Sequence, residues 1–241
     1  MLQMLKNIFF DKWFPHWSPD IALRYLPIVK EIKKEHSGAT ILDVGSGSLG
    51  ITPYLNKQVT GVDLLFLGPK SKLLKPVKIK GVMLPFRNNS FDYVVCVDVL
   101  EHVTAHKRNV FIHQLLRVAR KKVFLVFPTS AQAESEDRWM QNYITRKYGK
   151  PDPYLEEHIQ YGLPDLQTVL NQISNKHKIE VKSNINIYLH RIILIVQFSK
   201  SKLGRFTSSV IFVLLIPFFS KINLEPTYRK LIIVHKSKST K

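Results

Sequence analysis

The segment from Ala39 to Gly50 constrains the fold more than any other part of this 241-residue chain. Apolar, partly β-branched residues run up to Asp43, and glycines follow at positions 45, 47 and 50. The apolar part predicts a short strand buried on both faces. Because glycine accepts positive φ and has no side chain, the three glycines predict a sharp strand-to-helix turn whose backbone N–H groups face a bound molecule.

The spacing Gly-x-Gly-x-x-Gly is that of the dinucleotide-binding fingerprint. Two features argue against a nicotinamide or flavin cofactor. Asp43 stands two residues before Gly45, so its carboxylate would repel a pyrophosphate and attract a cationic amino-acid ligand. Only eight residues separate Gly50 from Val59, which leaves a short helix carrying Pro53. An NAD-dependent oxidoreductase is therefore the weaker alternative.

A second strand is predicted over residues 58–63, and it ends in Asp63. The strand lies beside the first in a parallel sheet, so the Asp63 carboxylate stands at the same edge as the glycine turn. There it can accept hydrogen bonds from both ribose hydroxyls of a bound nucleoside. The alternative interpretation is that Asp63 caps a helix that follows the strand.

The run from Met83 to His102 contains Leu-Pro-Phe at 84–86, turn residues at 88–90, an apolar strand at 91–97 and Leu-Glu-His at 100–102. Together with Ile41–Gly47 and Asp63, this run resembles, in order and spacing, class I S-adenosylmethionine-dependent methyltransferases of the small-molecule type. The resemblance covers residues 39–103.

This resemblance implies an α/β fold: a doubly wound, seven-stranded, mostly parallel sheet of order 3-2-1-4-5-7-6, with strand 7 antiparallel and helices on both faces. It implies S-adenosyl-L-methionine as the cofactor. Relatives usually carry an acidic residue before Leu-Pro-Phe that reaches the adenine, whereas this chain has Lys78–Val82 there. The predicted cofactor-binding residues are Asp43, Gly45, Ser46, Gly47, Asp63, Leu64, Met83, Leu84 and Asp98.

Methyl transfer from a sulfonium is an in-line displacement, so alignment and exclusion of water supply much of the catalysis. A general base is needed only for an acceptor that does not ionise by itself. The predicted catalytic residues are Glu101, His102 and His158; for the first two, capping or core packing at a helix start is the alternative. The single Cys96 and the spacing of the nine histidines predict no metal site.

The remaining segments complete a single domain spanning 1–241. Residues 1–38 form an N-terminal helical lead-in whose helix starts at Ser18 and Pro19. A helix over 106–120 turns Val110 inward, and 131–162 is predicted as an irregular, polar, substrate-side loop. Strands six and seven are expected at 178–188 and 228–235, with an apolar and basic insertion at 189–224 between them.

Net charge is +18, and the stretch from 176 to 241 holds 13 of the lysines and arginines against two glutamates. Such an excess indicates a polyanionic partner or a solvated lysine-rich surface. The apolar runs of 189–224 are shorter than the ~20 residues that span a bilayer. We expect contact with an anionic membrane surface through 189–224 and a small or lipid-like acceptor.

The N-terminus shows no secretory leader, which predicts a cytoplasmic protein that is peripheral at the membrane. A non-catalytic adaptor at a membrane or nucleic acid is the remaining alternative. Nucleic acid is the less favoured partner, because no motif that interleaves aromatic and basic residues accompanies the charge. The oligomeric state is not predicted.

Overall fold

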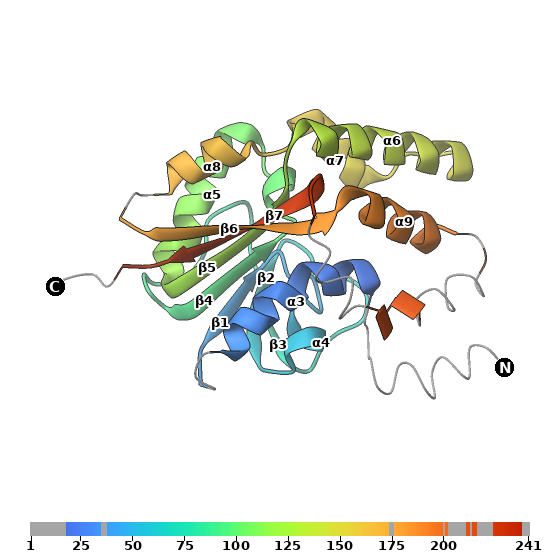
Figure 1. Ribbon diagram of the computed structural model, residues 1–241. Coiled ribbons are helices and arrows are strands. Elements are labelled where there is room, and N and C mark those ends of the chain that lie inside the picture. The colour runs from blue at the N-terminus through green and yellow to red at the C-terminus, as the bar shows by residue number, and fades with distance from the viewer. Residues whose placement is uncertain are drawn as a thin grey trace.

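Seven strands form one sheet in the order β3-β2-β1-β4-β5-β7-β6 (Figure 1). The computed structural model describes residues 18–34, 38–173, 176–199, 201, 211–212, 214–215 and 224–237, so the start of the predicted lead-in and much of 189–224 lie outside the described residues. The strands are β1 (Ile41–Val44), β2 (Val59–Asp63), β3 (Leu74–Lys78), β4 (Phe91–Val97), β5 (Ala119–Pro128), β6 (Lys178–Asn186) and β7 (Thr227–His235). β7 runs antiparallel to β5 and β6, and the other neighbouring strands pair in parallel. The predicted fold class is confirmed.

Helices cover both faces of the sheet (Figure 1). One apolar core lies under α3, α4 and α9, and a second lies under α5 and α8. The strand residues alternate between these two cores, which is why β1 and β4 are apolar almost throughout. The helices are α3 (Pro19–Lys33), α4 (Thr52–Leu55), the 3-10 turn η2 (Leu100–His102), α5 (Ala105–Val118), α6 (Ala131–Tyr148), α7 (Pro153–Tyr161), α8 (Leu166–Gln172) and α9 (Ile187–Gln197).

Residues 131–162 form two helices, α6 and α7, joined by a short turn at 149–152, which corrects the expectation of an irregular loop. The side chain of Ser130 caps α6 by accepting a hydrogen bond from the N–H of Ala133, and Asp152 caps α7 in the same way. The buried face of α6 includes Glu136 and Asp137, so a helical period of apolar residues is not visible in the sequence. The sequence pattern did not indicate this helix, because charged side chains that are paired inside the protein take positions that are usually apolar.

Two further expectations were wrong. The predicted strand 178–188 ends at Asn186, because the Asn186 side chain accepts hydrogen bonds from the N–H groups of Tyr188 and Leu189 and starts α9. Val110 does not face inward: it is 47% exposed, while the inward face of α5 holds Phe111 and Ile112.

The connections after β1 and β4 lead to opposite faces of the sheet. The chain passes from β1 into α4 on the side of α3, and from β4 through η2 into α5 on the other side. The two strands are paired in register, Val44 opposite Cys96. In a doubly wound sheet this divergence opens a crevice at the carboxyl ends of the strands.

Candidate active site

The glycine loop after β1 is held from beneath by Asp43. Its Oδ2 accepts a hydrogen bond of 2.7 Å from the N–H of Ile51. A Cβ at Gly50 would lie 2.2 Å from this oxygen, so only glycine allows the loop to close over the carboxylate. Asp43 itself is 0% exposed, and burial raises its pKa to about 7 against the opposing effect of the Ile51 N–H. Asp43 therefore shapes the loop from within.

Asp63 fixes the other end of the loop. Its Oδ2 accepts a 2.6 Å hydrogen bond from the N–H of Gly47, and its Oδ1 accepts one of 3.1 Å from the N–H of Leu65. The carboxylate is partly exposed at the end of β2. Each oxygen keeps a free lone-pair direction, which leaves the predicted contact with a ribose stereochemically available.

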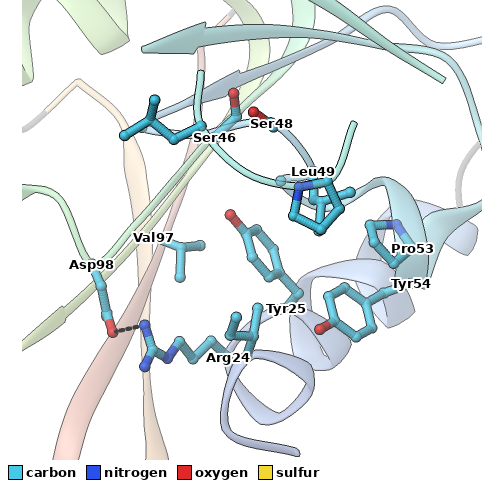
Figure 2. Close-up of a pocket in the computed structure, with 14 residues that line it drawn as sticks. Arg24, Tyr25, Ser46, Ser48, Leu49, Pro53, Tyr54, Val97 and Asp98 are labelled. Atoms are coloured by element: carbon cyan, nitrogen blue, oxygen red, sulfur yellow. Dashed lines mark ion pairs between the residues drawn. The ribbon is translucent and has the colours of Figure 1, made fainter. Parts of the chain in front are cut away.

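A pocket of about 300 Å³ lies between the glycine loop and α3 (Figure 2). Three of the predicted cofactor residues line it: Gly45, Ser46 and Asp98. The rings of Tyr25 and Tyr54 stack at 5.8 Å on its other side. Further lining residues are Ile21, Arg24, Ser48, Leu49, Gly50, Pro53, Leu67, Pro69 and Val97.

Asp98 is neutralised by arginines from two distant elements. Arg24 on α3 approaches its Oδ2 to 2.8 Å through Nη1, and Arg229 on β7 approaches the same oxygen to 2.7 Å through Nε. Arg24 also pairs with the buried Asp20, and the two arginines hold the pKa of Asp20 far below its usual range despite its burial. Arg24, Arg229, Asp20 and Asp98 thus form one network of ion pairs beside the pocket. The side chain of Arg24 is 23% exposed.

The other predicted cofactor residues lie outside this pocket. Leu64 and Met83 follow β2 and β3 and are 53% and 59% exposed. Leu84 is buried, and its N–H donates to the side chain of Gln114. Gly47, Asp63, Leu64 and Met83 come at or after the carboxyl ends of β1, β2 and β3.

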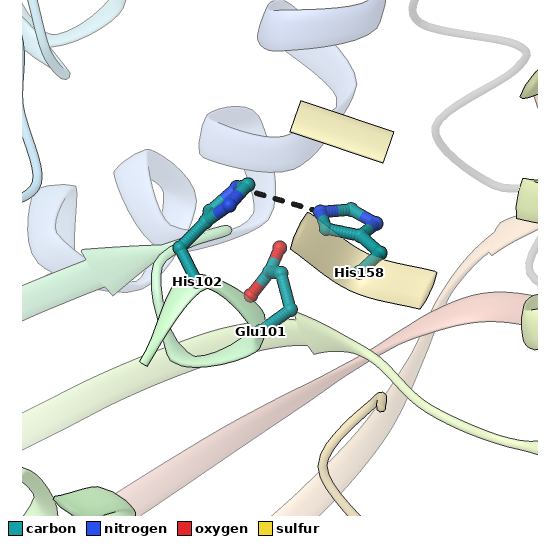
Figure 3. A group of neighbouring side chains, drawn as sticks. All are labelled: Glu101, His102 and His158. Atoms are coloured by element: carbon teal, nitrogen blue, oxygen red, sulfur yellow. Dashed lines mark hydrogen bonds between the residues drawn. The ribbon is translucent and has the colours of Figure 1, made fainter. Parts of the chain in front are cut away.

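The three predicted catalytic residues come together in space (Figure 3). Their ligand-type atoms lie within 4.8 Å of one another, although His158 is 56 residues from His102 in sequence. Burial, followed by the charge of Asp98, raises the pKa of Glu101. Burial and the neighbouring His158 lower the pKa of His102, against the opposing effect of the Glu157 carboxylate.

Carboxylates orient both histidines of the cluster. Nδ1 of His102 lies 2.7 Å from Oε2 of Glu157, and Nδ1 of His158 lies 2.8 Å from Oδ2 of Asp137. The hydroxyl of Tyr228 donates to the second oxygen of Asp137. These contacts join α6, α7 and β7 to the turn η2.

Sequence reasoning missed Arg24, Arg229, Asp137 and Glu157. For Arg24 a signal exists, because Asp20 precedes it by four residues on the same helix and the two form a pair. The other three come from elements far apart in the chain, and only the fold brings them to the site.

Comparison with known proteins agrees with this geometry. Residues 42–127 match the family model of the methyltransferase domain. Phosphoethanolamine N-methyltransferase 2 of Haemonchus contortus, solved with S-adenosyl-L-methionine, superposes with a TM-score of 0.57 at 18% identity, covering 98% of this chain and 60% of that one. A chain from the Haloferax volcanii complex of the Trm112 methyltransferase activator and a methyltransferase gives 0.54 at 11% identity, covering 97% and 96%. Residues 42–127 are thus similar to a methyltransferase domain, and at these identities the solved structures show the fold alone.

One curated relative is an uncharacterised protein of Methanocaldococcus jannaschii, 29% identical over 136 residues. The matched part is 49% of this chain and 59% of the relative, less than two thirds of its length.

Among the described residues, no helix has both the length and the apolar character needed to cross a membrane.

Proposed function

We propose that this chain transfers the methyl group of S-adenosyl-L-methionine, in line, to a small or lipophilic acceptor. The observation that carries the proposal is the 300 Å³ pocket where the glycine loop meets Arg24 and Asp98 in a methyltransferase fold. It lies at the carboxyl ends of β1 and β4, where open α/β sheets bind their ligands.

The methionine portion of the cofactor lies in the pocket in this proposal, because Arg24 lines it and a guanidinium binds a carboxylate well. The ribose then lies over Gly47 and bonds to Asp63, and the adenine lies between the exposed side chains of Leu64 and Met83. An apolar clamp of this kind replaces the acidic contact that the sequence lacks before Leu-Pro-Phe. Asp43 contributes indirectly, by holding the loop closed.

Glu101, His102 and His158 activate the acceptor in this proposal. The turn η2 starts two residues after Asp98, so the cluster stands beside the pocket at the same edge of the sheet. Tyr154, 67% exposed and edge-on to His102 at 5.7 Å, offers an aromatic wall on the acceptor side. Methyl transfer needs an acceptor atom held in line with the sulfonium, and this wall and cluster supply its position.

A membrane-presented acceptor is supported by exposed apolar side chains around α9. Tyr188 is 60% exposed and Ile192 is 53% exposed on this helix, and Leu214 is 71% exposed. Lysines and arginines are frequent in the same third of the chain. Apolar residues beside basic ones suit an anionic lipid surface, where burial and charge attraction act together.

The test is transfer of an isotopically labelled methyl group from S-adenosyl-L-methionine to extracts of small molecules and, separately, of lipids. Label should appear in one extract with the wild-type chain and be strongly reduced with Asp63→Ala. If S-adenosylhomocysteine binds but no extract is labelled, the catalytic proposal fails and the non-catalytic adaptor takes its place.

A further inference from the structure

The cluster of Glu101, His102 and His158 has a feature that an acid–base role does not require. The two imidazoles face each other through Nε2, with these nitrogens 3.4 Å apart and the ring centroids at 4.8 Å. Each ring uses its other nitrogen, Nδ1, on a carboxylate: Glu157 for His102 and Asp137 for His158. Because a carboxylate accepts hydrogen bonds, each Nδ1 serves as a donor, and the two Nε2 atoms are directed toward each other.

At 3.4 Å the two Nε2 atoms are close enough to share one proton in a hydrogen bond or to bind one cation between them. The carboxylate of Glu101 points toward the same space (Figure 3). Its side chain is 0% exposed, and neither oxygen has a hydrogen-bond partner among the described residues. A buried carboxylate without partners is costly, and metal coordination is one way in which proteins compensate for it.

We propose that Glu101, His102 and His158 bind one divalent transition-metal ion of the zinc type. Two histidines and a glutamate, with a position left for a further ligand, are a recurring donor set of catalytic zinc sites. Tetrahedral zinc with Zn–N bonds of about 2.0–2.1 Å places its nitrogen ligands roughly 3.3–3.4 Å apart, which matches the 3.4 Å between the two Nε2 atoms. One Glu101 oxygen and one ring nitrogen of each histidine lie within 4.8 Å of one another, so the Glu101 carboxylate must move closer to the two nitrogens to complete the ligand set.

The surroundings agree with a metal site. Histidines that bind metals commonly donate their second N–H to a carboxylate, which fixes the tautomer and makes the ligand nitrogen more basic. Both histidines of this cluster have such a partner, and Asp137 is in turn bound by Tyr228. The sequence did not predict this site, because Glu101 and His102 are adjacent whereas His158 lies on another helix.

The ion's role in catalysis rests on the proposed function, whereas its binding does not. An ion with one open position lowers the pKa of a hydroxyl or water bound there. An acceptor hydroxyl held in this position would give up its proton to water at neutral pH, and its oxygen would then bond to the methyl carbon as the S–CH3 bond breaks and S-adenosylhomocysteine leaves.

Calorimetry of the chelator-treated full-length chain with zinc chloride, and visible spectroscopy with cobalt chloride, test the site directly. We expect about one equivalent of either metal. Glu101→Gln keeps the size of the side chain but removes its charge, and it should weaken zinc binding, as should His102→Ala and His158→Ala. Glu157→Gln, at the rim of the site, should weaken binding by roughly 10–100-fold, and the ligand replacements by more.

His113→Ala is the matched control, since His113 is exposed on α5 and bonds only locally to the carbonyl of Asn109. It should bind zinc as the wild type does. S-adenosylhomocysteine binding, measured on each variant, reports whether the chain is folded and tests the cofactor site separately. Absence of zinc and cobalt binding in the wild type, or equal binding in Glu101→Gln and the wild type, would overturn the proposal.

Discussion

Replacing Asp63 by alanine should weaken S-adenosylhomocysteine binding about tenfold to a hundredfold. The carboxylate is fixed by the N–H groups of Gly47 and Leu65 at 2.6 and 3.1 Å, so it meets the ribose without further ordering. Hydrogen bonds to a charged group contribute roughly 1.5–3 kcal/mol, and each 1.4 kcal/mol is about tenfold in affinity. Asp63→Asn, which keeps one acceptor oxygen, should lose less. Isothermal titration calorimetry measures both.

Asp165→Ala controls for the loss of a carboxylate that accepts a backbone N–H. Asp165 bonds to the N–H of Thr168 at the start of α8 and does not line the pocket. The Asp165→Ala variant should bind S-adenosylhomocysteine with the affinity of the wild type. If Asp63→Ala also binds within about threefold of the wild type, the ribose contact is absent and the reasoning is refuted.

Three further predictions concern the pocket, the loop and the surface. Arg24→Gln should weaken the binding of S-adenosylhomocysteine in calorimetry but leave the binding of adenosine unchanged, because in the proposed complex Arg24 contacts only the amino-acid end of the ligand. Equal losses of affinity for both ligands would contradict this. Asp43→Asn should alter pH dependence: burial raises the pKa of Asp43 from 3.8 to about 7, so the native state keeps a proton that the unfolded chain loses. The wild type's urea stability relative to Asp43→Asn should therefore fall as pH rises through this window, and a rising or flat difference would refute the assignment. Ile192→Asp with Leu214→Asp should abolish flotation with anionic vesicles while Val110→Asp preserves it, and a wild type that ignores anionic vesicles at low salt would exclude the membrane contact.

The glycine loop and the location of the pocket followed from local patterns, whereas the strand order was implied by the family resemblance. Two segments, Ile41–Gly47 and the run from Met83 to His102, each predict one strand and the loop that follows it. Because the strands are parallel, these two loops lie at the same edge of the sheet. Gly45, Ser46 and Asp98, which were predicted to lie at this edge, line the pocket. These features depend on periodicity and turn chemistry within a few residues.

What the sequence did not show depends on contacts between distant segments. α6 turns Glu136 and Asp137 inward, where Arg191 and His158 pair with them, and this removes the apolar stripe by which a helix is recognised. Arg229 lies in an apolar strand, and only the sheet places it against Asp98. The facing imidazoles of His102 and His158 likewise result from the packing of α7 on η2.

Calorimetry of the wild-type chain with S-adenosylhomocysteine and, separately, with NAD tests the central claim most directly. The account predicts one site for S-adenosylhomocysteine, weakened in Asp63→Ala and Arg24→Gln, and no measurable heat of binding for NAD. Tight NAD binding together with no binding of S-adenosylhomocysteine would contradict it.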